Sequence, residues 1–316
     1  MIELGLQVEP MFGFSYLEIR ELAREAERGG FRTIWISDHF FLHPDSVATT
    51  SLEAWTVLAA LAVDTATIRL GPMVSCQSYR NPALLAKMAA SVDHLCGGRL
   101  DFGIGAGWKE NEYRAYGYDF PPAGVRVDEL VDTVAICRRL WTDERATYAG
   151  RRHSVADAPC APKPLQTPLP LWIGGRLPRM MRLAARSADW FNYLPAGRFP
   201  TPAHTREGFA QLDEACRAVG RDPATLGKSV FVLAVVGEDE RESERVAAEV
   251  AATAKLTPAE WQASRGAMVG TPERIAEVLR EHATAGARHA NVRFPYGHDL
   301  RMTRLLAKVA GQLRAA

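Results

Sequence analysis

Asp38 and His39 are the first residues in this 316-residue chain whose types and position could do chemistry. They directly follow the apolar run 32–37. An imidazole changes charge near neutral pH, so His39 could transfer a proton or anchor a substrate by a hydrogen bond. A histidine packed against loop backbone is the plainer alternative. The catalytic interpretation gains weight in a barrel, where polar residues at strand ends form the active site.

Glycine clusters follow two other apolar runs, at 105–107 and at 174–175. Glycine lets the backbone approach a ligand closely, and the start of a helix attracts anions. The second cluster continues into Arg176 and Arg179, with a proline between them where a helix would start. It therefore predicts a phosphate site, although a tight strand-to-helix turn explains the two glycines equally well.

An aromatic and acidic group follows the first glycine cluster, formed by Trp108, Glu112, Tyr113 and Tyr116. These side chains could line an apolar substrate pocket with a polar contact, and Gln7, at the end of the first apolar run, could join them. Packing under a lid is the alternative. Asp93 and His94 lie within a helical pattern, and we expect them on its solvated face.

The composition excludes several classes of function. With 38 basic and 37 acidic residues, the chain does not resemble a nucleic-acid or membrane-binding protein. The five cysteines are scattered, which favours a reducing compartment over a disulfide framework. No zinc-protease, serine-hydrolase or Walker motif is present, so we predict no metal site. Without a signal-like N-terminus or a long apolar stretch, we expect a cytoplasmic protein.

The elements that would position these residues alternate regularly along the chain. Eight short apolar runs read as strands, and helical patterns lie between nearly all of them. Eight strand–helix repeats predict an α/β fold, a (β/α)8 TIM barrel with insertions. A doubly wound sheet would have fewer strands and a glycine fingerprint after the first, which is missing. The expected strands are 2–8, 32–37, 68–74, 100–104, 170–173, 189–193, 229–236 and 289–294.

We expect one domain over residues 1–316. The stretch 142–168 is polar and rich in proline without a sustained period, and 195–228 begins irregularly. Both are predicted to be excursions on the barrel surface.

Four stretches resemble the luciferase-like family of flavin and deazaflavin barrels, and within it the branch of probable coenzyme F420-dependent oxidoreductases. The middle stretch, from IRLGPMVSCQSYRNPALL to DFGIGAGWKENEYRAYGYDFPP, is the most specific. The others are GGFRTIWISDHFF, PLPLWIGGRLPRMMRLAARSADWFN and VGTPERIAEVLR. Together they cover most of the chain from Gly29 to Arg280.

The resemblance implies roles for residues that match by position. Asp38 and His39 match the pair beside the deazaflavin ring, with His39 near the carbon that carries the hydride. A strand bulge behind the ring, where relatives hold a non-proline cis peptide bond, matches Met73, Val74 and Ser75. The remaining matches are Gly105, Ala106, Gly107 and Asn111, along the ring and ribityl chain, and Gly174, Gly175, Arg176 and Arg179, at the phosphate-binding turn.

Two positions depart from the pattern of the family. Sugar-phosphate dehydrogenases of the superfamily carry a glutamate where this chain has Trp108, so a general acid is replaced by an apolar wall. Relatives commonly continue the glycine pair with small residues, where this chain has Arg176-Leu177.

The resemblance implies hydride transfer between coenzyme F420 and a small organic substrate, with His39 handling the accompanying proton. An FMN-dependent monooxygenase on the same barrel is one alternative. A flavin-binding or scaffold barrel without turnover is another. The resemblance also suggests a homodimer.

Overall fold

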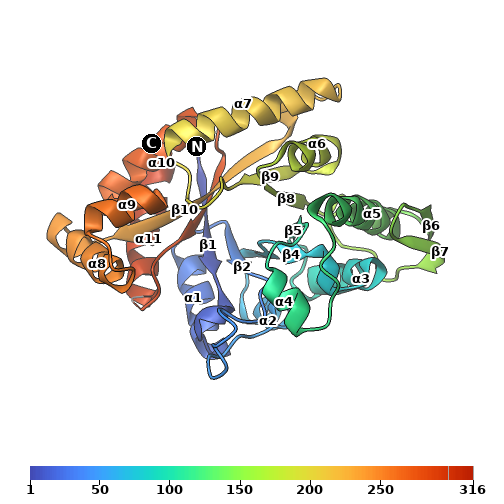
Figure 1. Cartoon of the computed structure of the whole chain (residues 1–316), viewed down its shortest axis with the longest axis horizontal. Helices are drawn as coiled ribbons and strands as arrows, with labels where there is room; N and C mark the ends of the chain where they lie inside the picture. Colours follow the sequence, from blue (N-terminus) through green and yellow to red (C-terminus); the bar gives the residue numbers. More distant parts are fainter. Residues whose placement is uncertain (298, 316) are drawn as a thin grey trace. The chain divides into compact units, whose positions relative to one another are not determined.

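The computed structural model describes residues 1–297 and 299–315. Strands alternate with helices along the chain, which Figure 1 colours from its blue N-terminus to its red C-terminus. All eight predicted strands are present, and each end lies within two residues of its predicted position. They are β1 (Glu3–Val8), β2 (Thr33–Ile36), β3 (Arg69–Pro72), β5 (Phe102–Gly105), β8 (Leu171–Gly175), β9 (Trp190–Tyr193), β10 (Gly227–Val236) and β12 (His289–Arg293).

Helices follow these strands as the apolar patterns predict. Several begin with a side-chain cap and a proline, such as the third, where Asn81 accepts a hydrogen bond from the backbone N–H of Ala83 at 2.9 Å ahead of the first turn. The helices are α1 (Tyr16–Arg28), α2 (Ala54–Asp64), α3 (Pro82–Leu95), α4 (Glu110–Ala115), α5 (Ala123–Thr142), α6 (Pro178–Ser187), α7 (Pro202–Ala218), α8 (Glu240–Thr253), α9 (Pro258–Arg265), α10 (Pro272–Thr284) and α11 (Asp299–Arg314), with short 3-10 turns at Pro10–Phe12, Gln77–Tyr79 and Pro223–Thr225.

The chain divides into two compact units. The first unit holds residues 1–8 and 17–35 and the chain from Gly175 onward, and the second unit holds residues 9–16 and 36–174.

The first unit is built on parallel strands in the order β2-β1-β12-β10-β9. Gly5 of β1 lies opposite Asn291 of β12, and Ser229 of β10 lies opposite His289. The three-residue strand β11 (Met268–Gly270), which the sequence did not predict, pairs with the carboxyl end of β10. Buried parallel strands of this kind read as nearly continuous apolar runs, which explains why the eight longer ones were recognisable.

The second unit contains β3, β5 and β8 with the two-residue strand β4 (Ser75–Cys76). β5 pairs in parallel with β4 on one side and β8 on the other. Between β3 and β4 the peptide bond from Met73 to Val74 is cis, which confirms the cis peptide bond expected there.

The stretch 142–168 is more regular than its sequence indicates. It contains an antiparallel hairpin of β6 (Arg145–Ala149) and β7 (Ser154–Pro159), which lies beside α5 in Figure 1. Most side chains of this hairpin are exposed, so its strands lack the apolar alternation that predicts a strand.

Asp93 does not lie on a solvated helix face, and the prediction for this residue is wrong. Its side chain is fully buried on α3. The carboxylate accepts hydrogen bonds from the backbone N–H and the side-chain amide of Gln166, at 3.1 and 2.8 Å. Its neighbour His94 is exposed, as expected. Asp93 therefore anchors the segment that leads into β8.

Within the described ranges no helix is long and apolar enough to cross a membrane. All five cysteines are free and buried.

Candidate active site

Asp38 lies just beyond β2 and is held in a buried ion pair. Its carboxylate accepts two hydrogen bonds from the guanidinium of Arg80, at 2.7 and 2.9 Å, and one from the backbone N–H of Cys76, at 2.9 Å. Arg80 also pairs with Glu53, whose side chain caps the start of α2. Burial alone would lower the pKa of Arg80, but the two carboxylates raise it above its ordinary value. The Asp38 carboxylate therefore has a structural role: it holds the backbone N–H of Cys76 next to the end of β2.

His39 faces a carboxylate that is entirely buried. Its Nδ1 lies 2.9 Å from Oε2 of Glu112, whose side chain is 0% exposed, against 18% for His39. The same oxygen accepts a hydrogen bond from the Tyr79 hydroxyl at 2.9 Å. The other oxygen accepts from Nζ of Lys109 at 3.0 Å and from the backbone N–H groups of residues 40 and 41, at 2.8 and 3.2 Å. Five donors thus converge on one carboxylate.

These donors keep Glu112 ionised. Burial alone would raise the pKa of its carboxyl group, but the hydrogen bond and charge of His39 and those of Lys109 lower it to about 2. An ionised carboxylate can only accept hydrogen bonds. Nδ1 of His39 must therefore donate, which leaves Nε2 as the ring nitrogen available to another partner.

Aromatic side chains surround this pair. The Trp108 indole, 70% exposed, meets the imidazole of His39 edge to face with 5.6 Å between ring centroids. Phe40 stacks on Tyr79 and on Tyr116, with centroids 4.3 and 4.1 Å apart. The imidazole consequently lies next to apolar surface, and the predicted apolar wall at Trp108 is beside it.

Val74 and Pro72 explain the two glycines of β5 and Gly174 of β8. A Cβ atom on Gly105 would lie 2.7 Å from a methyl group of Val74, and one on Gly174 would lie 3.1 Å from the other methyl group. A Cβ atom on Gly103 would lie 2.1 Å from the carbonyl oxygen of Pro72. These glycines therefore leave room for the segment that contains the cis peptide bond from Met73 to Val74.

Gly107 is required by a second contact. Its φ is +78°, and a Cβ atom there would lie 1.8 Å from the hydroxyl of Tyr113 and 2.8 Å from the sulfur of Cys76. The Tyr113 hydroxyl lies 3.1 Å from that sulfur and donates to Ser78 at 3.0 Å. Burial raises the pKa of Cys76 to about 11 and that of Tyr113 above its ordinary range, so both stay protonated. Tyr113 is fully buried and supports the turn that carries Trp108.

Three polar atoms at this end of the second unit have no hydrogen-bond partner among the described residues. They are the hydroxyl of Ser37, on a 4% exposed residue, and the side-chain oxygens of Gln77 and Asn111. Native proteins pair almost all buried polar groups, with protein, water or ligand. An exposed aromatic surface with unsatisfied polar atoms nearby fits a planar heterocycle that carries polar edges.

Three further residues that were predicted to contact the cofactor lie in the same unit. Met73 is 7% exposed, Ser75 is fully buried and donates to Asp38, and Ala106 is half-buried.

The predicted phosphate turn lies in the first unit from Gly175 onward. Arg176 and Arg179 are exposed at the start of α6, whose N-cap residue, Leu177, provides no side-chain cap. A Cβ atom on Gly175 would lie 2.9 Å from the side chain of Met180, so glycine is needed there for packing. An uncapped helix start next to two cations suits an anion.

Gln7 pairs with a residue that the sequence did not single out. The side-chain amide of Asn291 donates to Oε1 of Gln7 at 2.6 Å, and both side chains are fully buried in the first unit. Nε2 of Gln7 and Oδ1 of Asn291 have no partner among the described residues. Gln7 thus belongs to a buried amide pair across β1 and β12.

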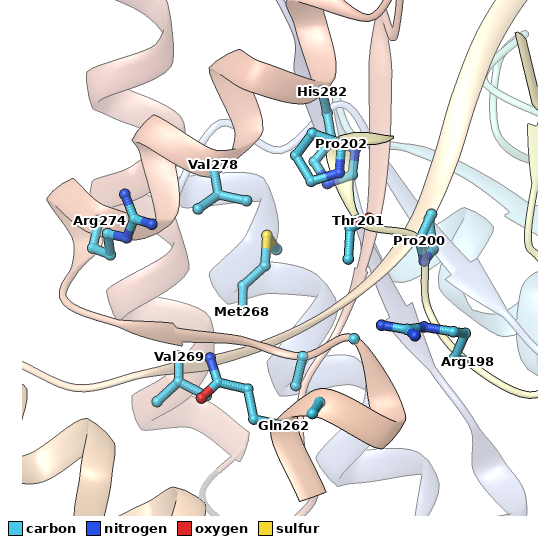
Figure 2. Close-up of a pocket in the computed structure, with 13 residues that line it drawn as sticks. Arg198, Pro200, Thr201, Pro202, Gln262, Met268, Val269, Arg274, Val278 and His282 are labelled. Carbon is cyan, nitrogen blue, oxygen red and sulfur yellow. The ribbon is translucent and has the colours of Figure 1, made fainter. Parts of the chain in front are cut away.

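The first unit also holds a cavity of about 260 Å³ that contains none of the predicted site residues. Figure 2 shows Met268 on β11, Gln262 on α9 and the segment 198–202 around it. His282 of α10 lines it and contacts the hydroxyl of Thr205 at 2.8 Å. Burial lowers the pKa of His282 to about 4, so its ring is neutral at physiological pH.

The residues that fix the catalytic candidates were not predicted from the sequence. Arg80 contacts Asp38 across 42 positions, and Tyr79 contacts Glu112 across 33. Glu53 contacts Arg80 across 27 positions, whereas Lys109 lies only 3 positions from Glu112. The one local signal was the polar sequence that follows Ser75-Cys76 at a strand end. Among residues 1–297 and 299–315, no group of three His, Cys, Asp or Glu side chains is arranged to hold a metal ion.

Comparison with known proteins identifies relatives over most of the chain. Residues 4–289 match the family model described as luciferase-like monooxygenase. An F420-dependent hydroxymycolic acid dehydrogenase of Mycobacterium tuberculosis is 33% identical over 218 residues, which are 69% of this chain and 58% of that protein. An F420-dependent glucose-6-phosphate dehydrogenase of Kineococcus radiotolerans is 27% identical over 320 residues, covering 94% of this chain and 93% of that protein.

Solved structures share the fold. An F420-dependent secondary alcohol dehydrogenase, solved with an F420-acetone adduct, superposes with a TM-score of 0.81 at 22% identity, over 98% of this chain and 99% of that one. A monooxygenase from Streptomyces bottropensis superposes with a TM-score of 0.82 at 22% identity, over the whole of both chains. The predicted (β/α)8 barrel is confirmed, and the chain belongs to the luciferase-like monooxygenase family.

Proposed function

We propose that this chain is a coenzyme F420-dependent oxidoreductase that moves a hydride between the deazaflavin and a small organic substrate. The two curated relatives described above are both named as F420-dependent dehydrogenases. The observation that carries the proposal is the hydrogen bond of His39 to the buried Glu112, at 2.9 Å. It leaves Nε2 of a half-buried imidazole free to exchange a proton at a strand end.

The bound cofactor supplies the hydride chemistry, and the protein supplies orientation, exclusion of water and a proton path. Nε2 of His39 accepts a proton when an alcohol is oxidised and returns it when a carbonyl is reduced. Asp38 and Arg80 hold the preceding backbone, so the imidazole keeps its position. Trp108 covers one side of the imidazole and limits the access of water.

We assign the cofactor contacts from both the resemblance and the fit of the site. In the second unit, Ser37 and Asn111 offer a hydroxyl and an amide to the polar edge of the ring. Val74, which packs against Gly105 and Gly174, would lie behind the ring and support it. The other proposed contacts are Asp38, His39, Met73, Ser75, Gly105, Ala106, Gly107 and Gly174 in the second unit, and Gly175, Arg176 and Arg179, for the phosphate, in the first.

We propose that the substrate is small and that the part of it next to His39 is uncharged. Trp108 presents a large apolar surface there, 70% exposed, where sugar-phosphate dehydrogenases carry a glutamate. Apolar surface of that size beside a reactive group favours a hydrocarbon body over a sugar phosphate. Glu112 and Tyr113 would shape this pocket through His39 and Trp108, because both are fully buried. Gln7 is fully buried as well, so in the first unit we propose that it acts on the substrate pocket through its hydrogen bond with Asn291.

An FMN-dependent monooxygenase is the second candidate. The family model carries the description of a monooxygenase, and a monooxygenase structure matches over the whole chain. Such an enzyme would consume oxygen and need a partner that supplies reduced flavin. A barrel that binds flavin without turnover is the third candidate, and it would neither reduce nor reoxidise its cofactor with any donor or acceptor.

The test is a fluorescence titration of the purified apoprotein with F420 and, separately, with FMN, followed by turnover with secondary alcohols and ketones. We expect tight binding of F420, weak binding of FMN and reduction of bound F420 by an alcohol without oxygen consumption. Tight binding of FMN with oxygen consumption would replace the proposal with the monooxygenase.

We further propose that residues 1–316 form a single domain, that the chain assembles as a homodimer and that it acts in the cytoplasm. The five buried free cysteines fit a reducing compartment. Light scattering on the purified protein tests the dimer.

A further inference from the structure

We propose that Glu112 is a positioning residue that fixes which nitrogen of His39 carries the proton. The catalytic part of this inference rests on the proposed function, whereas the part on the imidazole itself does not. Glu112 has no exposed surface, so it cannot touch the substrate directly, and it acts through His39.

The geometry determines the direction of each hydrogen bond around Glu112. Oε1 is surrounded only by donors, namely Nζ of Lys109 and the backbone N–H groups of residues 40 and 41. Oε2 faces Nδ1 of His39 and the hydroxyl of Tyr79, both at 2.9 Å. A carboxylate accepts from all five, so the neutral imidazole carries its proton on Nδ1 and a lone pair on Nε2.

A glutamine amide in place of the Glu112 carboxylate would reverse the direction of the hydrogen bond with His39. In the E112Q variant, the amide oxygen must take the position of Oε1, because three donors converge there. The NH2 group then faces Nδ1 of His39, which can only accept from it. The imidazole proton moves to Nε2, and the atom that should accept the substrate proton is blocked. A single isosteric change therefore inverts the tautomer without altering the volume of the side chain.

The experiment records nitrogen-15 spectra of histidine-labelled protein at alkaline pH, where imidazole is neutral, with the His39 signals assigned by their loss in the His39→Asn variant. The matched control is Glu110→Gln, the same change on the same helix at an exposed glutamate that pairs with Arg114 at 3.0 Å. We expect the proton on Nδ1 in the wild type and in Glu110→Gln, and on Nε2 in E112Q.

The second readout is turnover with F420 and an alcohol. We expect kcat of E112Q to fall roughly 10²-fold with KM nearly unchanged. A wild-type proton on Nε2 would overturn the inference even if E112Q failed to fold. So would an E112Q variant whose imidazole proton stays on Nδ1. If the protein lacked F420 turnover altogether, the proposed function would fail while the spectra still decided the tautomer.

Discussion

At the scale of single residues, the site contains two acidic groups with different tasks. Asp38 is bound by a guanidinium and a backbone N–H, so it fixes the end of β2. Glu112 is bound by the imidazole of His39, so it acts on the group that exchanges protons. Sequence order placed Asp38 next to His39, yet the carboxylate that contacts the imidazole comes from 73 positions away.

His39→Ala tests the proton-transfer role. The change removes Nε2 but leaves the aromatic surface and the polar edge atoms in place. We expect kcat to fall by about 10² to 10⁴-fold, the usual contribution of a positioned acid or base. The affinity for F420, measured by fluorescence titration, should change far less. Unchanged turnover would remove His39 from the mechanism.

Arg80→Met tests the buried ion pair. Asp38 would be left buried with a single backbone donor and the Ser75 hydroxyl, so its charge would be largely uncompensated. Breaking a buried pair by removing one partner costs about 3–5 kcal/mol, and urea unfolding should show a loss of that size. The control is Arg145→Met in the exposed pair with Asp157 on the β6–β7 hairpin, where we expect little change. Equal effects in the two variants would contradict the structural role of Arg80.

At the scale of elements, the packing of Val74 against β5 is the contact that shapes the bulge. We predict that Gly105→Ala destabilises the protein by about 1–3 kcal/mol, because its Cβ atom meets a methyl group of Val74 at 2.7 Å. Val74→Ala removes that methyl group. The double variant should therefore lose less stability than the sum of the two single losses, by more than about 0.5 kcal/mol in urea unfolding.

Gly311→Ala is the matched control for this cycle. A Cβ atom on Gly311 in α11 would meet nothing within 4 Å, so alanine should raise stability slightly through its helix propensity. Strictly additive losses for Gly105 and Val74 would contradict the packing described for the bulge.

Elements with strong apolar runs were predictable, and those without were not. The eight long strands were recognisable because both faces of a parallel strand are buried, so the sequence is apolar throughout. The β6–β7 hairpin is mostly exposed and lacks that signal. Asp93 was misplaced because its burial depends on Gln166, which is 73 positions away. Contacts distant in sequence also limited the prediction for Glu112. Its approximate place in the site was predictable, but the five donors that bind its carboxylate were not.

At the scale of the whole molecule, a ligand that binds only the folded chain stabilises all of it. F420 at 100 times its dissociation constant should raise the free energy of unfolding by about 2.7 kcal/mol and shift thermal unfolding upward by several degrees. FMN at the same concentration should produce a much smaller shift. The measurement uses the full chain and needs no substrate.

The phosphate turn gives this measurement a residue-specific test. Arg176 is exposed at the start of α6, where the helix dipole also favours an anion. Losing one charged hydrogen bond costs about 1.5–3 kcal/mol, so Arg176→Ala should weaken F420 binding by roughly tenfold or more and reduce the thermal shift at a fixed F420 concentration. Arg186→Ala, near the other end of the same helix, changes the net charge equally and should leave the shift intact. If Arg176→Ala kept the full shift, the phosphate group would have to bind elsewhere, and the large side chain after the glycine pair would need another explanation.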